Sequence, residues 1–175
     1  MSDAPDTPDG WNGDRSVDGG IDRLPVPSTS GTMWLCGKHL IGPDPVATIE
    51  RLGVDTVVCL SQQHEMVERY PEYIEWLANA GEHAIWHPIP DLHAPTVEEA
   101  EHLVDEILRR LDLGHKVLVH CGAGIGRAGT IAAAVLIRRN VPLQQALDTV
   151  ARCRPMGGPE AGAQTDLLHA IADGR

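Results

Sequence analysis

Short apolar runs alternate along this chain with longer stretches whose apolar residues recur every three or four positions. Four runs rich in β-branched and apolar residues predict strands, at Thr32–Cys36, Val54–Leu60, Ala84–Ile89 and Lys116–His120. The last is centred on Val117-Leu118-Val119, a continuous apolar run of the kind found in strands buried on both faces.

Capping residues delimit the helices between these strands. Asp44 followed by Pro45 predicts a helix that ends at Gly53, with Val46 on its apolar face. The pattern Thr96-x-x-Glu99 is a capping box and opens a helix that ends near Gly114. Further helices are predicted around Tyr70–Ala80, over Arg127–Arg139 and Pro142–Arg152, and from about Pro159 onward.

Alternation of strands and helices predicts an α/β fold, a three-layer sandwich with a central, mainly parallel sheet flanked by helices. Residues 1–30 are rich in Asp, Pro, Gly and Ser, and this composition predicts a flexible acidic N-terminal tail. Residues 31–175 then form one domain, which a length of 175 residues allows.

Charge and composition narrow the possible partners. The net charge is −11, from 14 Lys and Arg against 25 Asp and Glu, so nucleic acid and anionic membranes are not expected partners. The N-terminus is acidic and the chain has no apolar run of ~20 residues. Four cysteines without paired spacing predict free thiols and a cytoplasmic location. Cys36 and His39 have no second ligand pair, so neither metal nor cofactor is expected.

The segment after the strand at Lys116–His120 carries the clearest chemistry. Cys121 is followed by glycines at alternate positions and then by Arg127, where a helix begins. Glycines let the backbone amides point into one concavity, and the helix N-terminus adds positive potential, which together favour a bound anion and a cysteine thiolate. The predicted phosphate ligands are the backbone and side-chain donors of Gly122, Ala123, Gly124, Ile125, Gly126 and Arg127.

The pattern His120-Cys121-x5-Arg127 resembles the signature loop of the cysteine-dependent protein phosphatases, and the chain from Met33 to Ala172 is similar to their small, atypical dual-specificity branch. Pro88-Ile89-Pro90-Asp91 is similar to the general-acid loop of that family. The resemblance implies that His120 lies buried behind the loop and orders it. It also places Gln164 where several members carry a water-positioning glutamine.

The resemblance and the residue types imply one mechanism. Cys121 attacks phosphorus to form a phosphocysteine, Arg127 and the loop amides stabilise the transferred group, and Asp91 donates a proton to the leaving oxygen. Expected substrates are phosphorylated proteins or peptides, bearing phosphotyrosine and also phosphoserine or phosphothreonine. The loop contains no lysine, which favours phosphopeptides over phosphoinositides.

Two alternatives stay open at this point. The family usually carries Ser or Thr after the arginine, but this chain has Ala128, and Thr130 lies one residue beyond Gly129. A phosphate-binding module with little turnover is therefore one alternative. The other is a rhodanese-like sulfurtransferase, although the spacing of Cys121, Arg127 and Asp91 favours a phosphatase. A protective disulfide between Cys59 and Cys121 is a further possibility.

Overall fold

A computed structural model describes residues 18–174 of the chain. Its strands are β1 (Ile21–Leu24), β2 (Thr32–Gly37), β3 (Thr56–Cys59), β4 (Ala84–Trp86) and β5 (Lys116–Cys121). Its helices are α2 (Lys38–Ile41), α3 (Pro45–Leu52), α4 (Pro71–Asn79), α5 (Val97–Asp112), α6 (Gly126–Arg138), α7 (Leu143–Cys153) and α8 (Gly162–Ala172). Two short 3₁₀ helices are η1 (Gln63–Glu65) and η2 (Gly81–His83).

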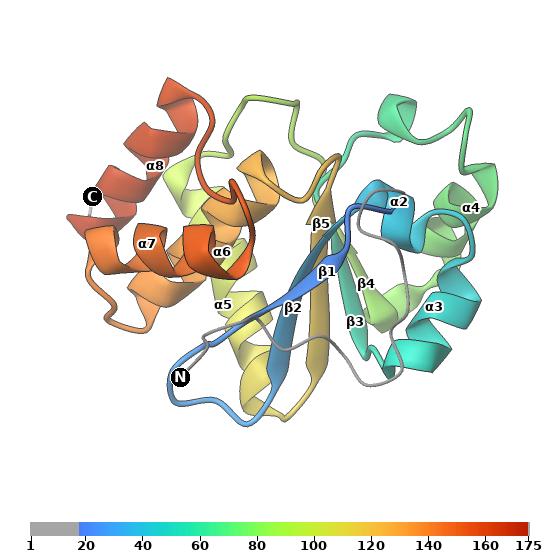
Figure 1. The fold of residues 1–175 in the computed structure, drawn as a ribbon, viewed down its shortest axis with the longest axis horizontal. Coiled ribbons are helices and arrows are strands. Elements are labelled where there is room, and N and C mark those ends of the chain that lie inside the picture. The colour runs from blue at the N-terminus through green and yellow to red at the C-terminus, as the bar shows by residue number, and fades with distance from the viewer. Residues whose placement is uncertain (1–17, 175) are drawn as a thin grey trace.

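The five strands form one sheet in the order β1-β2-β5-β3-β4 (Figure 1). β2, β5, β3 and β4 run parallel, and β1 pairs antiparallel with β2 at one edge. The predicted mainly parallel sheet is therefore confirmed. Because β5 lies at the centre of the sheet, the residues that follow it are surrounded by the ends of neighbouring strands.

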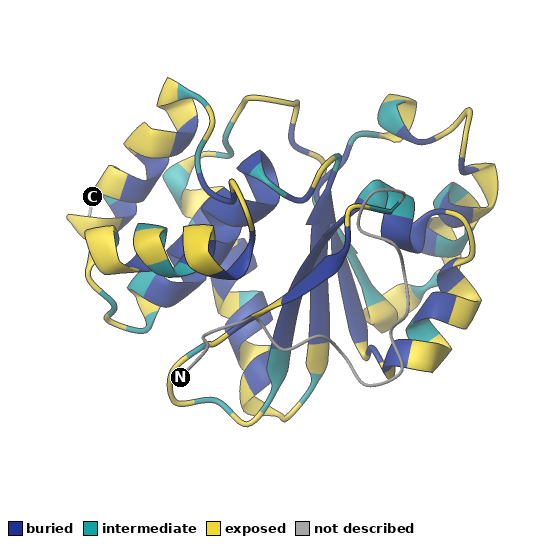
Figure 2. Ribbon diagram, viewed as in Figure 1, coloured by how far each residue is buried: buried dark blue, intermediate teal, exposed yellow. Residues whose placement is uncertain are grey.

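Helices cover both faces of the sheet, so the predicted three-layer α/β sandwich is confirmed (Figure 1). Side chains of β5 alternate between two cores. Val117 and Val119 pack with α5, α6, α7 and α8, whereas Leu118 packs with α2, α3 and α4. The helix α6 is buried along nearly its whole length between the sheet and its neighbouring helices (Figure 2).

Local capping signals act as expected. Asp44 Oδ1 accepts from the Ala47 amide at 3.0 Å, and Gly53 ends α3 with a φ of 65°. Thr96 and Glu99 form the capping box of α5. Val46 is 52% exposed, however, because Pro45 and Thr48 occupy the buried face of α3 instead. No helix within residues 18–174 has both the length and the apolar character needed to cross a bilayer.

The predicted boundary of the tail at residue 30 is wrong. Ile21 and Leu24 are 0% and 1% exposed and belong to β1, which pairs with β2. Asp22, between them, is buried in an ion pair with Arg154. The strand β1 has only four residues and lies in a segment of polar composition, so its sequence does not show it. The strand with which it pairs, β2, and the counter-ion of Asp22, Arg154, come from other parts of the chain. Residues 1–17 of the predicted tail lie outside the described residues.

Candidate active site

A cavity of about 350 Å³ opens where the parallel strands end. Residues after β2, β3, β4 and β5 all reach it, as expected for a ligand site at the carboxyl edge of a parallel sheet. The cavity is lined by Lys38, His39, Glu65, Asp91, Cys121, Gly122, Ala123, Gly126, Arg127 and Glu160. The predicted residues Cys121, Arg127 and Asp91 are thus brought together, although Asp91 lies 30 residues before Cys121.

The loop from Cys121 to Arg127 joins β5 to α6 and forms the floor of the cavity. Its tight path depends on Gly124, which has a φ of 74°. A Cβ atom there would collide with the backbone of Cys36 on the neighbouring strand. Because α6 begins at Gly126, the first amides of that helix are available to an anion in the cavity.

Arg154 braces this loop from behind. Its Nη2 donates to the carbonyl of Ala123 at 2.8 Å and its Nε donates to the carbonyl of Gly124 at 3.2 Å. Its Nη1 donates to Asp22 Oδ2 at 2.9 Å, and the side chains of both residues are almost fully buried. These bonds draw two loop carbonyls away from the cavity, which keeps carbonyl oxygens from facing a bound phosphate.

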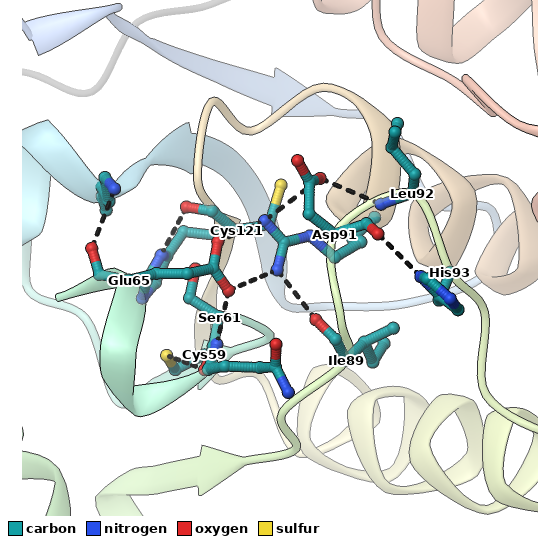
Figure 3. Close-up of polar contacts among 12 residues, drawn as sticks. Cys59, Ser61, Glu65, Ile89, Asp91, Leu92, His93 and Cys121 are labelled. Carbon is teal, nitrogen blue, oxygen red and sulfur yellow. Dashed lines mark hydrogen bonds and ion pairs between the residues drawn. The ribbon is translucent and has the colours of Figure 1, made fainter.

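Arg127 is held by Glu65 in a two-pronged ion pair. Arg127 Nη1 and Nη2 donate to the two oxygens of Glu65 at 2.8 and 2.7 Å, and Nη1 also donates to the carbonyl of Ile89 at 2.8 Å (Figure 3). Burial alone raises the pKa of Glu65, but hydrogen bonds from Arg127 and the Gln62 amide hold that pKa below its usual value. The Nε of Arg127 is buried and has no hydrogen-bond partner within residues 18–174, so this N–H donor is unsatisfied in this structure.

Asp91 stands at the mouth of the cavity on the loop that follows β4. Its side chain is 67% exposed, and Oδ1 lies 3.4 Å from Arg127 Nη2. Asp91 Oδ1 also accepts from the amide of Leu92 at 3.0 Å, and Leu92 has a φ of 63°. This turn aims the Asp91 carboxyl toward the Cys121 sulfur (Figure 3).

His120 lies beneath the loop and is fully buried. Its Nδ1 donates to the Cys121 carbonyl at 3.0 Å, and its Nε2 accepts from the Tyr73 hydroxyl at 2.5 Å in the matching neutral tautomer. Burial lowers the pKa of His120 to about 4. The imidazole therefore stays neutral at physiological pH and connects the loop to α4.

Gln164 is 1% exposed and does not line the cavity. Its Oε1 accepts from the Glu160 amide at 2.7 Å, and its Nε2 donates to the carbonyl of His93 at 3.2 Å. In this structure the Gln164 side chain thus connects the segment before α8 to the loop that carries Asp91.

The position after Arg127 lacks a hydroxyl. Ala128 is 0% exposed, and the Thr130 hydroxyl donates to the Gly126 carbonyl at 2.7 Å. Among the described residues no hydroxyl donates to the Cys121 sulfur, so the loop amides and the N-terminus of α6 are the polar groups that remain near it.

The other strand cysteines are chemically distinct from Cys121. Cys36 and Cys59 flank His120 in the sheet and belong to the core under α2, α3 and α4, whereas Cys121 packs in the opposite core. Both are free thiols, as is Cys121. Burial raises the pKa of Cys59 to about 12 and raises that of Cys36 further, so both stay protonated at neutral pH.

Sequence reasoning missed four residues of the cavity wall, namely Lys38, His39, Glu65 and Glu160. A signal existed for the first two, because they directly follow the strand predicted at Thr32–Cys36 and so belong at the carboxyl edge of the sheet. Glu65 follows the end of β3 by six residues and could be suspected on the same ground. Glu160 comes from the loop before α8, and no local pattern marks it.

At the carboxyl edge of the parallel sheet, Cys121 and Arg127 line one cavity and are joined by a glycine-rich loop. This arrangement defines a phosphatase domain with a cysteine nucleophile. The chain belongs to the family described as "Swiss Army Knife protein, DSP-PTPase phosphatase domain" (PTP-SAK), whose model matches residues 39–172.

Curated relatives carry the same class of domain. The chain is 28% identical over 128 residues to cyclin-dependent kinase inhibitor 3 of Sus scrofa, a match that covers 71% of this chain and 60% of that protein. It is 35% identical over 91 residues to dual specificity protein phosphatase 5 of Homo sapiens, covering 49% of this chain and 23% of that protein. The chain therefore matches less than two thirds of the length of these relatives.

Solved structures agree on the fold. The active form of Tk-PTP is 30% identical, covers 86% of this chain and 96% of its own, and superposes with a TM-score of 0.65. A kinase associated phosphatase with its catalytic cysteine replaced by serine gives a TM-score of 0.75 at 22% identity, covering 88% of this chain and 94% of its own. These similarities agree with the expected resemblance to small dual-specificity phosphatases.

Proposed function

We propose that this chain hydrolyses phosphate monoesters of phosphorylated proteins or peptides through a phosphocysteine on Cys121, accepting phosphotyrosine and also phosphoserine and phosphothreonine. One observation carries the proposal: Cys121 and Arg127 line the same cavity, with the exposed carboxyl of Asp91 3.4 Å from the Arg127 guanidinium. The names of the relatives, which include a dual specificity protein phosphatase, support the substrate class.

In the first step the Cys121 thiolate attacks phosphorus, so that an S–P bond forms as the P–O bond to the substrate breaks. Asp91 gives its proton to the departing oxygen. The loop amides and the Arg127 Nε stabilise the charge on the equatorial oxygens of the transferred phosphoryl group. Glu65 accepts one N–H from each Nη group of Arg127, and this two-point contact fixes the plane of the guanidinium.

In the second step water attacks the phosphocysteine and transfers a proton to Asp91. The S–P bond breaks, inorganic phosphate leaves, and the thiolate is regenerated. No cofactor takes part in this scheme. We also place the protein in a reducing compartment such as the cytoplasm, since the mechanism needs the Cys121 sulfur as a thiol and Cys121 forms no disulfide with another described residue.

The test is hydrolysis of a chromogenic aryl phosphate and of peptides carrying phosphotyrosine, phosphoserine or phosphothreonine. Cys121→Ser should abolish turnover yet retain binding of tungstate or phosphate, because the loop amides and Arg127 remain. Cys153→Ser, which changes a thiol on α7 outside the cavity, is the matched control and should stay active. Acid-quenched wild-type enzyme should carry a phosphoryl group on Cys121.

The same experiment separates the alternatives. Phosphate binding without release of aryl alcohol would identify a binding module with little turnover. Sulfur transfer from thiosulfate, with no action on the aryl phosphate, would identify a sulfurtransferase; Asp91 beside Cys121 has no role in that reaction, which favours the phosphatase.

A further inference from the structure

Glu160 is the one wall residue whose carboxylate has no partner within residues 18–174. It is exposed and lies in the loop between α7 and α8. A Cβ atom on Gly126 would collide with the Glu160 carboxylate, so the carboxylate lies against the first residue of α6. A negative group therefore stands at the edge of the loop that holds the substrate phosphate.

The backbone of Glu160 is fixed at this place. Its amide donates to Gln164 Oε1 at 2.7 Å, and the same buried Gln164 donates to the carbonyl of His93, on the loop that carries Asp91. A single side chain thus sets the position of Glu160 relative to the Asp91 loop. The backbone of Glu160 is therefore held in a defined position at the wall of the cavity.

The other two carboxylates of the cavity wall, those of Glu65 and Asp91, both lie beside the Arg127 guanidinium. Lys38 Nζ donates to the backbone carbonyl of Glu65 at 2.9 Å, and the Glu65 carboxylate is paired with Arg127. Asp91 Oδ1 lies 3.4 Å from the same guanidinium. Among the described residues that line the cavity, Glu160 is the acid without an ion pair.

In the proposed mechanism the phosphate binds between Cys121 and Arg127, which both line the cavity together with Glu160. A phosphate bound there is repelled by the Glu160 carboxylate. A substrate that carries a cation next to its phosphate removes this repulsion and gains an ion pair at the rim. A substrate with an acidic group next to its phosphate adds to the repulsion. The Glu160 carboxylate therefore favours substrates with a neighbouring cation and disfavours substrates with a neighbouring anion.

We propose that Glu160 forms a subsite for a lysine or arginine side chain next to the phosphorylated residue, so that the enzyme selects phosphopeptides with basic flanking residues. This inference rests on the proposed phosphatase function. The net charge of −11 adds to the preference through attraction of basic peptides over longer distances.

The test compares three phosphotyrosine peptides that differ only in the flanking residues, which are lysine, alanine or glutamate. Wild-type kcat/KM should be about two- to fivefold higher for the lysine peptide than for the alanine peptide, as expected for an exposed ion pair at the rim. It should be lowest for the glutamate peptide. The preference should shrink as salt is raised, because rim charges are screened.

Glu160→Gln should remove most of the difference between the three peptides, and Glu160→Lys should reverse their order. Glu72→Gln removes the same charge from an exposed position of α4 outside the cavity and should keep the wild-type order. Aryl phosphate, which has no flanking charge, should be hydrolysed at least as well by Glu160→Gln as by wild type.

An unchanged order of the peptides in Glu160→Gln overturns the subsite. An equal loss on every substrate, aryl phosphate included, also overturns it and assigns Glu160 to the chemical steps. Failure of the proposed function looks different, because wild-type enzyme would then release no phosphate from any of these substrates.

Discussion

The carboxylate of Glu65 lies under the substrate cavity and grips the guanidinium of Arg127 through bonds of 2.7 and 2.8 Å. Two residues 62 positions apart thereby form one unit. The carboxylate accepts one N–H from each Nη group, and the buried Nε has no partner within residues 18–174. We therefore expect Arg127 to bind phosphate in a fixed direction, because the two bonds to Glu65 restrict rotation of the guanidinium.

Glu65→Gln tests this role. Gln can accept from only one Nη group, so Arg127 should lose its fixed direction and a charge-assisted bond worth about 1.5–3 kcal/mol. We expect kcat/KM on aryl phosphate to fall about ten- to a hundredfold. Glu68→Gln, an exposed neighbour outside the cavity, is the control and should match wild type. Unchanged kinetics in Glu65→Gln would show that the loop alone orients Arg127.

Asp91→Asn tests the proton donor. The amide cannot protonate a leaving group, so kcat should fall by about 10²–10⁴ for an ester of a weakly acidic alcohol or phenol. The loss should be much smaller for an aryl phosphate whose phenol leaves without a proton. A series of aryl phosphates measured on both forms decides this, and equal losses across the series would exclude Asp91 as the donor.

Ala128 leaves the Cys121 sulfur without a hydroxyl donor, and expulsion of the thiolate from the phosphoenzyme should therefore be slow. We expect a burst of aryl alcohol close to one equivalent per enzyme, followed by a slower steady state. Ala128→Ser should raise the steady-state kcat about ten- to a hundredfold and weaken the burst.

Rapid-mixing kinetics on Thr130→Val provide the control, because the Thr130 hydroxyl is bonded to the Gly126 carbonyl. This variant should keep the burst of the wild type. A wild type without a burst, together with an unchanged kcat in Ala128→Ser, would show that another donor serves the sulfur during turnover.

His120 should make stability depend on pH. Burial lowers its pKa in the folded protein from 6.5 to about 4, so between these values the unfolded chain binds more protons than the folded one. Stability should therefore fall as pH decreases from 6.5 toward 4, with a total contribution of about 3 kcal/mol. Denaturant unfolding of wild type and His120→Gln across this range should show a smaller slope in the variant. An equal slope in both would assign the pH dependence to other groups.

Features set by neighbouring residues could be predicted from the sequence. In each of the caps of α3 and α5, the capping side chain and the amide that it binds lie within a few residues of each other in the chain. The segment from Cys121 to Arg127 likewise includes the end of a strand, the turn and the start of a helix. Asp91 was predicted because Pro88-Ile89-Pro90-Asp91 is similar to the general-acid loop of the phosphatase family.

Features set by distant partners could not be predicted. Arg154 pairs with Asp22 across 132 residues, and nothing in the residues around either one predicts the other as its partner. Glu65 and Glu160 belong to the site because they lie against Arg127 and Gly126, respectively, which are distant from them in the sequence. The strand β1 has four residues, too few for a periodic signal against a polar background.

The bracing of the loop by Arg154 has a consequence for where this domain begins. The family model matches residues 39–172, yet Asp22 and the carbonyls of Gly19 and Gly20 supply three of the acceptors of Arg154. A chain trimmed to the matched region would lose β1 and β2 and leave a buried guanidinium without its counter-ion. The part that resembles other proteins is shorter than the part that must fold, and the N-terminal strand belongs to the catalytic unit.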